Sequence, residues 1–93
     1  AKQADEARRA LAELRNRAEA LAYACERALE GVERLPPSQR AAVLADTAAL
    51  RARLAEGAPA PAIEAALLTL ERSSQQIYAA LLGEAPPPGQ GGP

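Results

Sequence analysis

Apolar residues recur along the first third of the chain at alternating spacings of three and four. This heptad pattern is typical of a helix that packs one face into a bundle. It predicts a long amphipathic helix over residues 2–34, which Gly31 weakens and Pro36 and Pro37 end. The predicted core positions of this helix are Leu11, Leu14, Ala18, Leu21, Cys25, Ala28 and Val32.

Two shorter stripes predict a second helix over residues 38–56 and a third over residues 60–82. The second ends at Gly57, a residue suited to the left-handed turn that follows a helix. Pro59 and Pro61 fit the start of the third, because the first N–H groups of a helix have no intrahelical acceptor to lose. No segment has the alternation of a strand. The predicted core positions of these two helices are Val43, Leu50, Leu54, Ile63, Leu67, Leu70, Ile77 and Leu81.

The short connections between the three helices predict an all-α, antiparallel, up-down-up three-helix bundle within residues 1–83. At about 1.5 Å per residue the first helix is about 50 Å long, against about 28 Å and 35 Å for the others. Its first ten to twelve residues are therefore expected to project past the bundle. Residues 84–93 (EAPPPGQGGP) contain few apolar side chains, and we expect a disordered tail there.

Composition removes most kinds of chemistry. The chain has no His and one Cys, which excludes Ser-His-Asp or Cys-His catalysis and a Cys/His zinc site, so no enzyme, metal site or cofactor site is expected. Cys25, within the core stripe, is expected to pack as a small hydrophobe. The net charge of −1 comes from interspersed acids and bases, so neither nucleic acid nor a membrane is an expected partner. The opening residues read as the middle of a charged helix, which suggests a piece of a longer protein.

One stripe of the first helix is expected to face away from the bundle. Counting Leu11 as heptad position a, the b and f positions include Asp5, Asn16, Glu19 and Tyr23. Tyr23 is one of only two aromatic residues in the chain, and an outward tyrosine favours a contact face. The alternative is a solvated tyrosine that lies along its own helix.

The run from Arg15 to Tyr23 (RNRAEALAY), followed by Glu26 and Leu29, resembles the RN-x-AE-x-L-x-Y-x-x-E-x-x-L segment of the lid helix in Hsp70 chaperones of the DnaK type. The resemblance extends over about residues 3–82. Further positions with similar residues in that family are Leu35-Pro36, Gly57, Ile63-Glu64, Ser74-Gln75 and Ile77-Tyr78.

This resemblance implies a function for the chain. In that family the helical lid closes over an unfolded client peptide held in a β-sandwich of the same chain, and a separate ATPase domain with ATP and Mg²⁺ controls its opening. The lid itself has no catalysis. The resemblance implies that Asp5, Glu19 and Tyr23 make polar latch contacts to the β-sandwich, and that the protein is cytoplasmic.

Two further expectations concern assembly. The unsupported start of the first helix is expected to self-associate weakly with a second copy. The alternative to the lid is a spectrin-like or adaptor three-helix bundle whose heptad face mediates oligomerisation.

Overall fold

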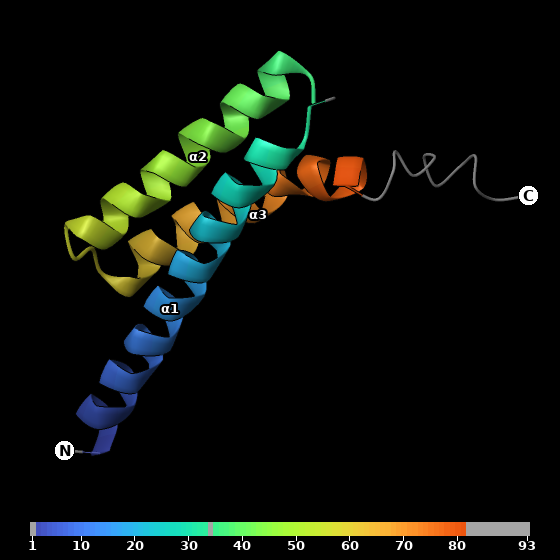
Figure 1. The fold of residues 1–93 in the computed structure, drawn as a ribbon. Helices are drawn as coiled ribbons and strands as arrows, with labels where there is room; N and C mark the ends of the chain where they lie inside the picture. Colours follow the sequence, from blue (N-terminus) through green and yellow to red (C-terminus); the bar gives the residue numbers. More distant parts are fainter. Residues whose placement is uncertain (1, 34, 82–93) are drawn as a thin grey trace, which may run out of the picture.

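Three helices pack as an antiparallel, up-down-up bundle, which confirms the predicted all-α fold (Figure 1). The computed structural model describes residues 2–33 and 35–81. Helix α1 spans Lys2–Gly31, α2 spans Pro37–Ala55 and α3 spans Ala60–Leu81. The tail expected over residues 84–93 lies outside the described residues.

Helix α1 ends three residues earlier than predicted. The Arg40 side chain, which comes from α2, donates hydrogen bonds to the carbonyl oxygens of Leu29 and Val32 at this end, the first at 2.8 Å. These carbonyls have no helical N–H partner, so an external donor favours ending the helix here. Helix α2 then begins at Pro37, whose missing N–H costs nothing in a first turn.

The predicted stop after α2 is confirmed at Gly57, which has a φ of 70°. The N–H of Gly57 donates to the Leu54 carbonyl at 3.2 Å, and the N–H of Ala58 donates to the Arg53 carbonyl at 3.0 Å. These two bonds form a Schellman motif, which needs a left-handed residue in the Gly57 position. Ala58 is buried, so the turn also closes one end of the core.

The core of α2 and α3 consists of aliphatic side chains at the predicted positions. Thr47 and Ser74 lie in the same buried stripes, and their hydroxyls donate to the carbonyls of Val43 and Glu71 at 2.7 and 3.0 Å. A bond to the preceding turn satisfies a buried hydroxyl without a partner from another helix. The side chain of Leu81 lies outside the described part. The buried apolar residues are Val43, Leu50, Leu54, Ile63, Leu67, Leu70 and Ile77.

The buried face of α1 is rotated from the predicted heptad face. Leu14, Ala18 and Cys25 are buried as expected, and so is Val32 just past the helix end. Partly buried instead are Leu11, Leu21 and Ala28, while buried residues that the heptad pattern missed are Ala22 and Leu29.

Ala22 and Leu29 stand at position e, so the buried face is centred between a and e rather than between a and d. At 100° per residue this is a rotation of about 50°. Two causes act together. Helix α1 packs against both α2 and α3 and needs a face wider than a coiled-coil seam, and a straight helix drifts from a strict seven-residue repeat.

The first part of α1 projects past the ends of α2 and α3, as predicted (Figure 1). The three helices measure about 45, 28 and 33 Å at the standard rise. Every residue from Lys2 to Ala10 is exposed. This segment therefore has no core contact within the described part of the chain.

Candidate docking surface

Tyr23 and Asp5 lie on exposed parts of α1. Tyr23 is 60% exposed on the section of α1 that belongs to the bundle, and Asp5 is exposed on the projecting section. Their separation of 18 positions corresponds to about 27 Å along the helix. A surface that contacts both must therefore be extended and must follow the helix axis.

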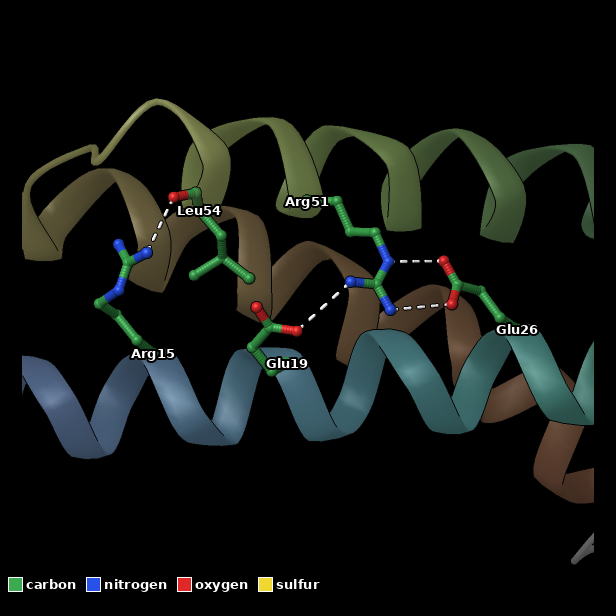
Figure 2. A network of polar contacts seen from close by, with 5 residues as sticks. All are labelled: Arg15, Glu19, Glu26, Arg51 and Leu54. Carbon is green, nitrogen blue, oxygen red and sulfur yellow. Dashed lines mark hydrogen bonds and ion pairs between the residues drawn. The ribbon is translucent and has the colours of Figure 1, made fainter.

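Glu19 does not point freely away from the bundle, which corrects the sequence prediction. Its Oε1 atom lies 3.3 Å from Nη1 of Arg51 on α2 (Figure 2). The Glu19 side chain is nevertheless 57% exposed. Glu19 thus lies at the border between the α1–α2 interface and the solvent, with Tyr23 one turn further along.

Arg51 is the centre of this polar contact between α1 and α2. Its Nε donates to Oε2 of Glu26 at 2.7 Å and its Nη2 donates to Oε1 of the same carboxylate at 2.9 Å. Figure 2 shows the guanidinium placed between Glu26 on one side and Glu19 on the other. Arg51 therefore makes a two-point contact with Glu26 and a single, longer contact with Glu19.

The contact with Arg51 affects the ionisation of Glu26. Hydrogen bonds from the guanidinium lower the pKa of the Glu26 carboxyl below its ordinary value, and burial opposes this shift. The same pairing raises the pKa of Arg51. Glu26 therefore stays ionised at neutral pH, as a bidentate partner of an arginine should.

The rotated buried face of α1 explains why Glu19 and Glu26 approach α2. Both stand at heptad position b, which flanks a face centred between a and e but would lie on the outside of a face centred between a and d. Tyr23 stands at position f, further around the helix, and stays outside in either case. The sequence prediction therefore had the wrong rotation for the b positions.

Two further arginines join α1 to α2. Nη2 of Arg15 donates to the carbonyl of Leu54 at 2.9 Å, near the C-terminus of α2, while Arg40 reaches the C-terminus of α1. Each helix thus supplies a cation to the last carbonyls of the other, where the helix dipole favours positive charge. The sequence prediction missed the cross-helix contacts of Arg15, Arg40 and Arg51. The eleven-residue spacing of Arg40 and Arg51, which is three helical turns, was the available signal.

An open groove of about 470 Å³ lies where α1 leaves the bundle beside the start of α3. Small apolar side chains and three charged ones line it. Its lining residues are Ala7, Ala10, Leu11, Glu13, Leu14, Arg17, Ala60 and Glu64.

Cys25 is buried and points into the core, beside Ser74 of α3. Burial raises the pKa of the Cys25 thiol, so the neutral, unreactive form prevails at neutral pH. Among the described residues no three potential metal ligands gather in one place.

None of the helices in residues 2–33 and 35–81 is long and apolar enough to span a membrane. Comparison of the chain with protein-family models, with curated protein sequences and with solved structures returned no match.

Proposed function

We propose that this chain is the helical lid of a chaperone of the Hsp70 type, which closes over an unfolded peptide bound in a β-sandwich of the same protein. The proposal starts from the lid-helix motif between Arg15 and Tyr23. In this proposal the protein is cytoplasmic, and the lid is a mechanical part without catalysis. ATP and Mg²⁺ belong to a separate ATPase domain.

The observation that carries the proposal is the exposed, projecting segment of α1 from Lys2 to Ala10. An isolated helical end of about ten residues is marginal in water, so such a segment gains from a surface that covers it. Asp5 of this segment lies on the same side of α1 as Tyr23, because a separation of 18 residues is five full helical turns, whereas Ala7 and Ala10 are exposed on the opposite side. A β-sandwich beneath the projecting segment, with the three-helix body beyond it, suits this shape.

The groove beside the projecting segment lies on a different face of α1 from Tyr23. It continues the apolar face of α1 beyond the point where α3 begins, on the side roughly opposite Asp5 and Tyr23. In the isolated chain this groove and the exposed alanines are open to a second copy, which is the basis for the proposed weak self-association.

Tyr23 gives the proposal its sharpest test, because the chain offers a matched control. Tyr78 on α3 is the other tyrosine and is also exposed, at 44%. The experiment measures release of a fluorescein-labelled, leucine-containing peptide from the ADP-bound, full-length protein that contains this chain. Tyr23→Ala should accelerate release about five- to thirtyfold, as expected for loss of a contact of about 1–2 kcal/mol. Tyr78→Ala should leave the release rate unchanged.

In the isolated chain, each substitution should change the free energy of unfolding by less than about 0.5 kcal/mol, since both side chains are at the surface. Equal release rates for wild type and Tyr23→Ala would contradict the lid function. If, in addition, the isolated chain sediments as a tight dimer or higher oligomer, the adaptor function is favoured.

A further inference from the structure

The three contacts of Arg51 suggest a role beyond holding α2 to α1. We infer that Arg51 competes with the docking partner for the Glu19 carboxylate and thereby sets how tightly the lid closes. The inference rests on the proposed function, because it assumes that Glu19 contacts the surface that covers α1. It also specifies the chemistry of that contact, which is a cation presented to Glu19.

The geometry separates a firm contact from a weak one. Arg51 binds Glu26 through two nitrogens at 2.7 and 2.9 Å, which is the planar two-point arrangement that guanidinium and carboxylate groups favour. It reaches Glu19 through one nitrogen at 3.3 Å. Within the described part of the chain Arg51 is the only cation within 4.0 Å of Glu19.

Glu19 can therefore leave Arg51 at little cost. Both side chains are more than one-third exposed, and exposed ion pairs contribute little because water screens them. Once Glu19 turns to an incoming cation, Glu26 still neutralises Arg51. No charge is left without a partner, so the free energies of Glu19 bound to Arg51 and of Glu19 bound to the partner's cation are similar. A small change at Arg51 therefore shifts the equilibrium between them.

Competition predicts opposite effects on peptide release for substitutions of Arg51 and of Glu26. Arg51→Met keeps the apolar stem and removes the competing cation, so the lid should close more tightly and peptide release should slow. Glu26→Gln removes the favoured partner of Arg51, which then turns to Glu19, so release should quicken. If Arg51 instead held Glu19 in place for docking, Arg51→Met would quicken release.

Charge alone could act at a distance, and the chain provides controls for this. Arg27 and Glu30 form an exposed pair with each other at 3.5 Å, one and four residues beyond Glu26. Arg27→Met and Glu30→Gln change the net charge in the same way as the two test variants but leave Arg51 intact. The effects of these controls on peptide release measure the long-range electrostatic contribution, which decreases as the salt concentration rises.

The experiment measures release of a fluorescein-labelled, leucine-containing peptide from the ADP-bound full-length protein. Arg51→Met should slow release about two- to fivefold, the range for a weak surface ion pair, and Glu26→Gln should quicken it by a similar factor. Each effect should exceed that of its control. In a Glu19→Gln background both effects should vanish, because the carboxylate for which Arg51 and the docking partner compete is then absent.

Three results would overturn the inference. Faster release with Arg51→Met, effects no larger than the controls, or effects that persist without the Glu19 charge would each do so. If Glu19→Gln itself quickens release while Arg51→Met has no effect, only the competition fails and the lid function stands. If neither Glu19→Gln nor Tyr23→Ala changes release, the proposed function fails together with the inference.

Discussion

Arg51 and Glu26 form the strongest charge contact described between α1 and α2, and both are only partly shielded from water. Their pairing lowers the pKa of the Glu26 carboxyl, so folding is linked to its ionisation. A carboxyl whose pKa is lower in the folded state stabilises the fold above its unfolded pKa of about 4.3. That stabilisation is lost as the pH falls through the folded pKa.

Replacing Glu26 should therefore make the stability of the fold depend less on pH in the acid range. The midpoint of urea unfolding of the wild type should fall as the pH drops below about 4.3, and Glu26→Gln should show a smaller fall. Glu30→Gln is the control, because the contact described for Glu30 is an exposed one with Arg27. Profiles of Glu26→Gln and wild type that stay parallel from pH 7 to pH 3 would rule out this linkage.

At the scale of helices, the antiparallel pair α1–α2 is closed at both ends by cross-helix arginines. Arg40 reaches the last carbonyls of α1, and Arg15 reaches the end of α2. Because these carbonyls have no helical N–H partners, each arginine satisfies groups that the helix itself leaves open.

Removing the Arg40 head group should weaken the end of α1. Arg40→Met should lower the free energy of unfolding by about 1–2 kcal/mol, the range for partly exposed hydrogen bonds from a charged group. Arg27→Met, which loses an exposed contact with Glu30, should change it by less than about 0.5 kcal/mol. Denaturant titration gives both values. A cost for Arg40→Met no larger than the control would show that the C-terminus of α1 needs no such donor.

The rotated face of α1 predicts which leucines matter most. Leu50 is fully buried, so Leu50→Ala should lower the free energy of unfolding by about 2–5 kcal/mol. Leu21 is only partly buried, so Leu21→Ala should lower it by less than about 2 kcal/mol. Leu44, half exposed on the same helix as Leu50, is the control and should cost less than about 0.5 kcal/mol. Equal losses of unfolding free energy for Leu21→Ala and Leu50→Ala would show that Leu21 is a core residue, as the heptad pattern predicted, and would contradict the rotated face.

These elements mark how far sequence reasoning reaches. The stripes around Leu50 and Leu70 and the stop at Gly57 were predictable, because periodicity and turn chemistry are local properties. The burial of Ala22 and Leu29 was not, because it depends on α1 having two partners. The contacts of Arg51 depend on how α2 is aligned along α1, which only the packed structure determines. Tyr23 was placed outside correctly because its position is far from either version of the buried face.

For the whole molecule, the main feature is a bundle with one helix longer than its partners. The three-helix body has a continuous core, but the segment from Lys2 to Ala10 contributes nothing to it. In the lid proposal this segment is completed by the surface of another subdomain. The same segment in the isolated chain should open locally far more often than the bundle does.

Amide hydrogen exchange along α1 tests this account most directly. Residues 6–12 should exchange rapidly in the isolated chain, while the amides of residues 18–25 are protected by the bundle. In the ADP-bound full-length protein with peptide, residues 6–12 should slow by at least about tenfold, and residues 18–25 should change little. Equally rapid exchange of residues 6–12 in both samples would show that nothing covers the projecting segment of α1 and would contradict the lid function.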